Sequence, residues 1–220
     1  MIKKIFILIL LSLTFLIADS QNKRHSPYYY QKVTLFESLP NDSNEIVFLG
    51  NSITDGCEWS ELFDDLRIKN RGISGDVTLG VLDRLYEVTE SHPLQIFIMI
   101  GVNDLAAGIS QDTIFSRYER IIKRVKSSSP KTELFVQSVL PVNPEFKKFS
   151  NHVNKTNQII ELNKKLKKLC KNYKLSYIDL HSFFKIEGNK LNPEYTNDGL
   201  HLTGKGYLLW KSLVEGYISR

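Results

Sequence analysis

The stretch Glu-Ile-Val-Phe-Leu-Gly-Asn-Ser-Ile-Thr, residues 45–54, carries the clearest indication of the fold. After Glu45 it is an unbroken apolar run, which is typical of a strand buried on both faces of a parallel sheet. The run changes at Gly50 to small and polar residues, as expected where a strand ends in a turn. We therefore predict a buried strand over residues 45–49 that leads directly to the hydroxyl group of Ser52.

The same order, a short apolar run and then a longer amphipathic stretch, recurs along the rest of the chain. This alternation is typical of βαβ units around a parallel sheet, so we predict an α/β fold without internal repeats. The predicted strands are residues 45–49, 67–71, 95–100, 133–138 and 176–178. The predicted helices are residues 28–39, 59–66, 79–91, 113–127, 153–173 and 204–218, the last with Thr203 as its N-cap.

The N-terminus has the pattern of a secretory signal peptide, which we predict over residues 1–20. Lys3 and Lys4 precede an apolar run over residues 5–18, and small and polar residues follow it. The run is shorter than the roughly 20 residues that cross a bilayer. We expect cleavage before Gln21, a secreted or periplasmic protein and no stable membrane insertion afterwards, with an uncleaved anchor as the alternative. Residues 21–220 contain no linker-like segment and are predicted to form a single domain.

Composition and charge narrow the classes of protein further. The chain has 220 residues, 42% of them hydrophobic and 24% charged, with a formal net charge of +5, which indicates a globular protein and excludes a disordered chain or a coiled coil. Lysines alternate with leucines at helical spacing in residues 162–174, which we interpret as a solvated helix face. We expect no nucleic-acid partner, because no aromatic residues alternate with these lysines. For Cys57 and Cys170, a disulfide and two buried thiols are both open.

Three of the predicted strands are followed by polar or glycine-containing turns. Because the carboxyl ends of parallel strands lie at one edge of the sheet, where α/β proteins bind ligands, we expect these turns to meet in one crevice. Asp198 and His201 precede the last predicted helix and can reach the same edge. The turns are Gly50-Asn51-Ser52, Gly72-Ile73-Ser74-Gly75 and Gly101-Val102-Asn103-Asp104.

Ser52 is the candidate nucleophile, because a serine directly after a buried strand is held rigidly beside backbone N–H groups. The alternative is that Ser52 only caps the following helix. A serine needs a neighbouring base, and His201 is the candidate, with Asp198 three residues ahead to accept its Nδ1 proton. The alternative is that His181 is the base. His201 would then have only a structural role. We expect the other histidines away from the site: His25 near the cleavage point, and His92 and His152 at the surface.

Two further groups could stabilise an oxyanion. The backbone N–H of Gly72 has no side chain beside it to block an approaching substrate, and the side-chain amide of Asn103 is a second donor. The alternative for both residues is a structural role in their own turns.

Four motifs together resemble the four sequence blocks of the SGNH hydrolases, also called GDSL esterases/lipases. They are the motifs around Ser52, around Gly72 and around Asn103, and the stretch Asp198-Gly199-Leu200-His201-Leu202. The resemblance runs from about residue 45 to 215. It implies a flavodoxin-like three-layer α/β/α sandwich with a parallel five-stranded sheet in the order 2-1-3-4-5. It also implies hydrolysis of a small-molecule ester without a metal or other cofactor.

Carried over by position, the resemblance implies Ser52 as nucleophile and oxyanion donor, Gly72 and Asn103 as the other donors, His201 as base and Asp198 as its orienting partner. The first block departs from the family, since it reads Gly-Asn-Ser in place of Gly-Asp-Ser. Asparagine keeps the shape and hydrogen-bonding ends of aspartate, so we expect the turn to persist without the negative charge.

The segment 71–85 resembles the branch of this family that contains platelet-activating-factor acetylhydrolase subunits and bacterial sialate O-acetylesterase-like proteins. That branch favours small acyl groups. The expected function is therefore a serine esterase that hydrolyses short-chain, acetyl esters of O-acetylated carbohydrate through an acyl-enzyme. The alternatives are a lysophospholipase, another short-chain acyl esterase or a thioesterase, and, in another class, a non-catalytic glycan-binding protein on the same fold.

Overall fold

The computed structural model describes residues 24–219, and the predicted signal peptide lies outside them. Five strands form a parallel sheet in the order β2-β1-β3-β4-β5, which confirms the expected topology. Each strand lies within one residue of its predicted bounds. The strands are β1 (Ile46–Gly50), β2 (Ile68–Gly72), β3 (Gln95–Met99), β4 (Glu133–Gln137) and β5 (Ser176–Ile178).

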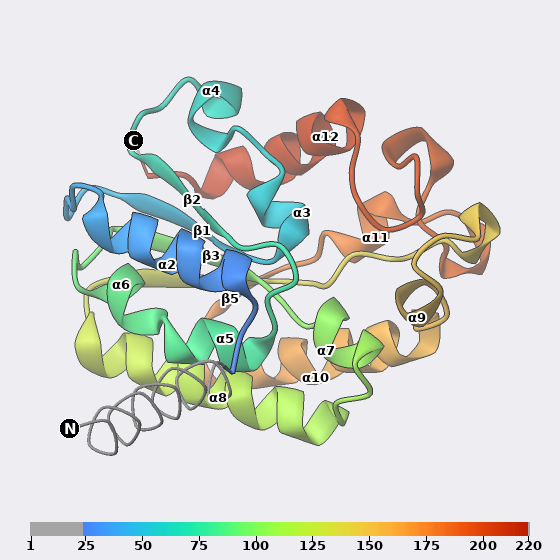
Figure 1. The fold of residues 1–220 in the computed structure, drawn as a ribbon, viewed down its shortest axis with the longest axis horizontal. Coiled ribbons are helices and arrows are strands. Elements are labelled where there is room, and N and C mark those ends of the chain that lie inside the picture. Colours follow the sequence, from blue (N-terminus) through green and yellow to red (C-terminus); the bar gives the residue numbers. More distant parts are fainter. Residues whose placement is uncertain (1–23, 220) are drawn as a thin grey trace, which may run out of the picture.

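Helices cover both faces of the sheet and complete the predicted α/β/α sandwich (Figure 1). Helices α4 and α12 pack on one face, whereas α5, α6, α8 and α10 cover the other. None of the described helices is both long and apolar enough to cross a bilayer. The helices are α2 (Pro27–Ser38), α3 (Ser52–Asp55), α4 (Trp59–Phe63), α5 (Thr78–Asp83), α6 (Leu85–Thr89), α7 (Val102–Ala106), α8 (Gln111–Ser128), α9 (Ser150–Val153), α10 (Thr156–Tyr173), α11 (His181–Phe184) and α12 (Gly204–Val214).

A row of aromatic rings in the core keeps the central strands in register. Phe48, Phe97 and Phe135 are paired neighbours on β1, β3 and β4. Their rings stack with centroids 5.0 and 4.5 Å apart, and Trp59 of α4 stacks on Phe48 at 4.0 Å. Aromatic pairs at such distances add to the stability that burial alone supplies. The strand ends that carry the polar turns are therefore fixed on a rigid core.

The register brings the first three turns to one level of the sheet. Gly50, the last residue of β1, pairs with Gly72 of β2 on one side and with Met99 of β3 on the other. The turns that follow these three strands therefore begin side by side, as expected for the carboxyl edge of a parallel sheet.

The lysine-rich face of α10 is solvated, as predicted. Ile159, Leu162, Leu166 and Leu169 are buried, and the intervening lysines Lys164, Lys167 and Lys168 are exposed. The spacing of the buried residues is that of one helix face turned towards a core.

Several helices are shorter than predicted. The helix expected over residues 79–91 is interrupted at Arg84 and forms α5 and α6. Helix α4 ends at Phe63, because Asp64 adopts a left-handed conformation, and α12 ends at Val214. Thr203 does occupy the N-cap of α12, but its side chain makes no capping hydrogen bond.

Both cysteines are free thiols. Cys57 follows α3, and Cys170 lies in α10, which is on the other face of the sheet from α4 (Figure 1). Burial raises the pKa of each thiol to about 12. The sequence left open either a disulfide or two buried thiols, and the structure shows two buried thiols.

Candidate active site

The structure brings Ser52, His201 and Asp198 together in one chain of hydrogen bonds. Ser52 Oγ lies 3.0 Å from His201 Nε2, although the two residues are 149 positions apart. His201 Nδ1 lies 2.8 Å from Asp198 Oδ2. The side chains of His201 and Asp198 are 31% and 14% exposed, so the group is partly open to solvent at the carboxyl edge of the sheet.

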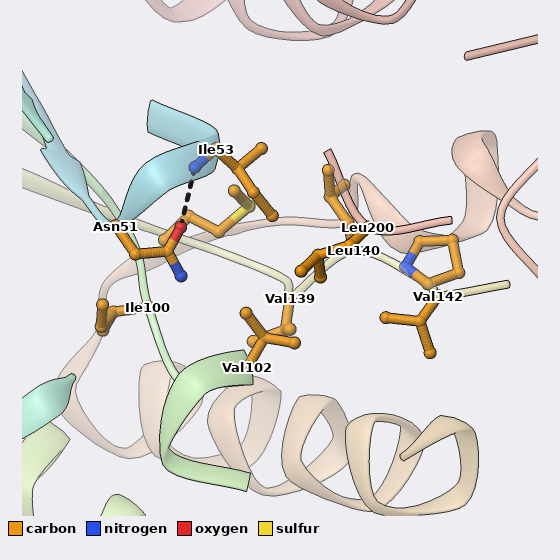
Figure 2. Close-up of a pocket in the computed structure, with 10 residues that line it drawn as sticks. Asn51, Ile53, Ile100, Val102, Val139, Leu140, Val142 and Leu200 are labelled. Carbon is orange, nitrogen blue, oxygen red and sulfur yellow. Dashed lines mark hydrogen bonds between the residues drawn. The ribbon is translucent and has the colours of Figure 1, made fainter. Parts of the chain in front are cut away.

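Asn51 fixes the turn that carries Ser52. The Asn51 side-chain oxygen accepts the Ile53 N–H at 3.0 Å (Figure 2) and so caps α3. Ser52 is the first residue of that helix. The alternative that Ser52 only caps the helix is therefore wrong. An asparagine oxygen accepts the capping bond as an aspartate oxygen would, which explains why the turn persists without the charge.

Helix α3 is held by bonds to its carbonyl groups from neighbouring aromatic side chains. Trp59 Nε1 donates to the Thr54 carbonyl at 2.8 Å, and the Tyr207 hydroxyl donates to the Ile53 carbonyl at 2.9 Å. Because both aromatic residues belong to the face that α4 and α12 cover, the position of Ser52 is tied to that layer of the sandwich.

The loop before α12 builds the carboxylate–imidazole pair from local contacts. Asp198 Oδ1 accepts the N–H groups of Leu200 and His201 at 2.9 and 2.8 Å, and Gly199 supplies the positive φ of +84° that this tight turn requires. Burial raises the pKa of Asp198, but the hydrogen bonds from His201 and Leu200 outweigh burial and leave the pKa below its ordinary value. An ionised Asp198 holds a proton on His201 Nδ1, so Nε2 can accept the proton of Ser52.

Asn103 lies at the same edge, with its side chain between two segments. Its Nδ2 donates to the Asp76 carbonyl at 2.8 Å, and its Oδ1 lies 3.0 Å from His152 Nε2. One of the two Nδ2 hydrogens is left for a further acceptor. The amide therefore bonds across the site, and the alternative that it only bonds within its own turn is wrong.

The prediction of Gly72 as an oxyanion donor requires correction. Its N–H donates to Asn70 Oδ1 at 2.8 Å and is not free. The position requires glycine for another reason, because a Cβ there would lie 2.1 Å from the Asp55 nitrogen. Gly72 thus allows α3 to pack directly on β2.

Gly75, three residues further along the same turn, was not among the predicted donors, but its N–H is open. Its φ is +81°, and no group in residues 24–219 accepts its N–H. The adjoining Asp76 carbonyl accepts the Asn103 amide, so this part of the turn lies beside Asn103. The turn Gly72-Ile73-Ser74-Gly75 contains two glycines, and glycine is the residue that adopts a positive φ most readily. The second glycine was therefore the signal in the sequence that could have pointed to Gly75.

The turn that contains Gly75 is anchored to α3 through Asp55. The Asp55 carboxylate accepts both the N–H and the hydroxyl of Ser74, at 3.2 and 2.8 Å, and pairs with Lys32 of α2 at 2.9 Å. Burial raises the pKa of Asp55, and the bonds from Lys32, Ser74 and Tyr28 lower it by more. The Gly75 turn and Ser52 are thereby linked through one ionised side chain.

Two residues of the segment before α10, Phe149 and His152, also lie at the site, although neither was predicted there. The exposed ring of Phe149 meets the ring of His201 edge to face at 5.1 Å. His152, expected at the surface, is half-buried and contacts Asn103. His181, the alternative base, is buried, and its Nε2 has no partner in the part of the chain that the structure describes, whereas the partner of Ser52 is His201.

A small apolar cavity lies beside the Ser52 turn, since Asn51 and Ile53 line it. Its volume is about 10 Å³, and Ile53, Val102 and Leu200 contribute to its wall (Figure 2). Each of them is next in sequence to a residue of the site: Ile53 to Ser52, Val102 to Asn103 and Leu200 to His201. Among the described residues, no group of three His, Cys, Asp or Glu side chains is placed to hold a metal ion.

Comparison with known families agrees with this geometry. Residues 48–209 match the model of the GDSL-like lipase/acylhydrolase family, and this range includes the Ser52 turn, the Asn103 turn and the Asp198–His201 loop. The chain belongs to this family. It is therefore a GDSL-type ester hydrolase, and the Ser52–His201 hydrogen bond is consistent with the catalytic pair of such an enzyme.

Individual relatives of this GDSL hydrolase are distant. It is 27% identical over 169 residues to the platelet-activating factor acetylhydrolase IB subunit alpha2 of Rattus norvegicus, covering 74% of this chain and 71% of that protein. It is 28% identical over 145 residues to an N-acylneuraminate cytidylyltransferase of Streptococcus agalactiae, covering 66% of this chain and only 33% of that protein. A GDSL-like lipase structure from Bacteroides thetaiotaomicron has a TM-score of 0.75 and 27% identity, covering 86% and 96% of the two chains.

Proposed function

We propose that this GDSL hydrolase removes acetyl groups by two-step acyl transfer, and the hydrogen-bonded chain Ser52–His201–Asp198 is the observation that carries the proposal. His201 Nε2 takes the Ser52 proton while Oγ bonds to the ester carbonyl carbon. The imidazolium, stabilised by Asp198, then protonates the leaving alcohol as the carbon–oxygen bond breaks. Water, deprotonated by the same His201, releases the acid from the acyl-enzyme and restores Ser52.

The oxyanion of both tetrahedral intermediates needs hydrogen-bond donors. We assign this role to the N–H groups of Ser52 and Gly75 and to Asn103 Nδ2. Among residues 24–219, neither backbone N–H has an acceptor, and Asn103 has one hydrogen to spare. Removing one such donor typically costs about 100- to 1000-fold in rate.

The size of the apolar cavity supports a short acyl group. A volume of about 10 Å³ is close to that needed for a single water-sized sphere. Ile53, Val102 and Leu200 are each at most 3% exposed, so a longer acyl chain could occupy this cavity only by displacing packed side chains. The relative from Rattus norvegicus is itself named an acetylhydrolase.

The exposed ring of Phe149 supports a carbohydrate as the alcohol. This ring is 44% exposed and lies beside His201, the residue proposed to protonate the leaving alcohol. A flat aromatic surface in that place suits the C–H face of a sugar ring. We therefore propose an O-acetylated carbohydrate as substrate.

Initial rates on p-nitrophenyl esters from acetate to palmitate, on acetylated monosaccharides and on lysophosphatidylcholine test this function. We expect the highest kcat/KM on acetyl esters. Ser52→Ala and His201→Ala should each lose at least about 1000-fold in kcat, because the members of such a triad act as a unit. Ser212→Ala, a change at an exposed serine of α12, is the matched control and should leave the rates unchanged.

The substrate panel separates the alternatives. A maximum at long acyl chains, or on lysophosphatidylcholine, would contradict the acetyl-carbohydrate assignment and indicate a lipase or lysophospholipase. Equal rates for the parent protein and Ser52→Ala would contradict the serine mechanism and favour a glycan-binding protein.

We also propose that the protein is exported, on the evidence of the charged and then apolar pattern of residues 1–20. N-terminal sequencing of the protein recovered from the periplasm or the medium should begin near Gln21. Recovery of the full-length chain from the cytoplasm would contradict export.

A further inference from the structure

Asn103 is held by groups on both sides of its amide. On one side Nδ2 donates to the backbone carbonyl of Asp76 at 2.8 Å. On the other side Oδ1 lies 3.0 Å from Nε2 of His152. His152 belongs to α9, a short helix that packs against α7, the helix that carries Asn103.

The chemistry of the two contacts sets the direction of both hydrogen bonds. A backbone carbonyl can only accept, so the Asp76 side of the amide must be the NH2 group. The side that faces His152 is then the oxygen, which also can only accept. His152 Nε2 must therefore carry a hydrogen and donate it to Asn103 Oδ1.

The surroundings of His152 favour its neutral ring, which can donate a hydrogen bond to Asn103 Oδ1 without placing a positive charge there. Burial, and then the nearby charges of His201 and Lys155, lower the pKa of His152. At neutral pH the ring is therefore uncharged and has a single N–H, which the contact with Asn103 places on Nε2. The ring of Phe149 meets the rings of His152 and His201 edge to face, at 6.1 and 5.1 Å.

An asparagine amide can present either of its ends to a substrate by turning about its last torsion. With Nδ2 towards the site, the amide stabilises an oxyanion. With Oδ1 towards the site, the partial negative charge of the carbonyl repels the same oxyanion. The rate of acyl transfer therefore depends on the contacts with the Asp76 carbonyl and with His152, which together exclude the second orientation.

We propose that His152 is a positioning residue of the oxyanion hole: opposite the Asp76 carbonyl, its Nε2–H holds Asn103 Oδ1, so that Nδ2 faces the substrate oxygen. The inference rests on the proposed role of Asn103 as an oxyanion donor. His152 makes no hydrogen bond to Ser52 within residues 24–219, and in this role it acts only through Asn103. A residue in this role affects the transition state more than substrate binding, so it changes kcat more than KM.

A double-mutant cycle with p-nitrophenyl acetate tests the proposal. His152→Leu removes the donor and should lower kcat by about 10- to 100-fold, part of the 100- to 1000-fold that removing a donor typically costs. KM should change by less than about threefold. His152→Gln presents an N–H at the place of Nε2 and should keep kcat within about threefold, whereas His152→Asn is too short to reach and should behave like His152→Leu.

The decisive arm is His152→Leu in the Asn103→Ala background, where no amide is left to position. There the substitution should cost less than about threefold, because the effects of coupled residues are not additive. Melting temperatures of all variants identify losses that come from unfolding.

Two outcomes overturn the inference alone: full activity in His152→Leu, or an equal loss from His152→Leu with and without Asn103. Full activity in Asn103→Ala overturns both the inference and the proposed donor role of Asn103. Full activity in Ser52→Ala is the separate result that would reject the esterase mechanism itself.

Discussion

The position of Gly72 shows how closely the site is packed at the scale of a single residue. The backbone of α3 lies so near to β2 that a Cβ on Gly72 would be 2.1 Å from the Asp55 nitrogen and 2.6 Å from the carbonyl carbon of Thr54. Backbone atoms cannot move aside as a flexible side chain can. Gly72 thus sets the distance between the strand and the helix that begins with Ser52.

Gly72→Ala should therefore destabilise the protein by at least about 1–3 kcal/mol, the usual cost of overpacking, and displace Ser52. Gly204→Ala is the control, because a Cβ at Gly204, the first residue of α12, has no neighbour within 4 Å. That change should be neutral or slightly stabilising. Urea unfolding of both variants measures the difference, and equal stability of the two would contradict the close approach of α3 to β2.

At the scale of an element, the break between α5 and α6 is explained by the buried side chain of Arg84. Its guanidinium is fully buried, pairs with Asp76 at 2.9 Å and Glu87 at 3.1 Å, and donates to the carbonyls of Gly50 and Arg71. One side chain thus joins the ends of β1 and β2 to the segment whose carbonyl holds Asn103. The helix is interrupted at Arg84, the residue whose side chain pairs with Asp76 and Glu87.

Arg84→Met should lower the free energy of unfolding by about 3–5 kcal/mol, because it leaves the buried Asp76 carboxylate without its partner and leaves Glu87 with Arg71 alone, at 3.3 Å. Lys205→Met is the control, since the pair of Lys205 with Glu194 is 70% and 52% exposed and should contribute at most about 1 kcal/mol. Chemical denaturation of both variants measures the contrast. Similar losses in the two would show that Arg84 is not the buried connection described above.

At the scale of the whole molecule, the sheet separates the surroundings of the two thiols. Cys57 adjoins α4 on one face, and Cys170 packs from α10 on the other. Both are at most 5% exposed. The fold is therefore stabilised by its apolar core and buried polar contacts, without a disulfide between these residues.

We expect the melting temperature to be the same with and without dithiothreitol. A chromogenic disulfide reagent should label both thiols only as fast as the protein opens, because buried thiols with a pKa raised to about 12 are poor nucleophiles. Labelling followed through a urea titration should thus coincide with loss of the helical signal by circular dichroism. Rapid labelling of the folded protein, or a lower melting temperature under reduction, would contradict this arrangement.

Features that depend on neighbours in the chain were predictable from the sequence. The alternation of short and longer segments located all five strands within one residue, although β2 is itself largely polar. The three-residue spacing from Asp198 to His201 predicted their hydrogen bond, because a tight glycine turn allows few other geometries. The strand order and the role of Ser52 followed from the resemblance of four motifs to one family.

Features that depend on contacts between distant segments were decided only by the tertiary structure. The sequence suggested Gly72 as an oxyanion donor, but the fold places Asn70 against its N–H and leaves that of Gly75 without an acceptor. His152 looked like a surface residue until the fold placed it against Asn103, 49 positions away. Periodicity and spacing describe which face a residue presents locally, whereas the partner of a buried polar group depends on which strands and helices pack together.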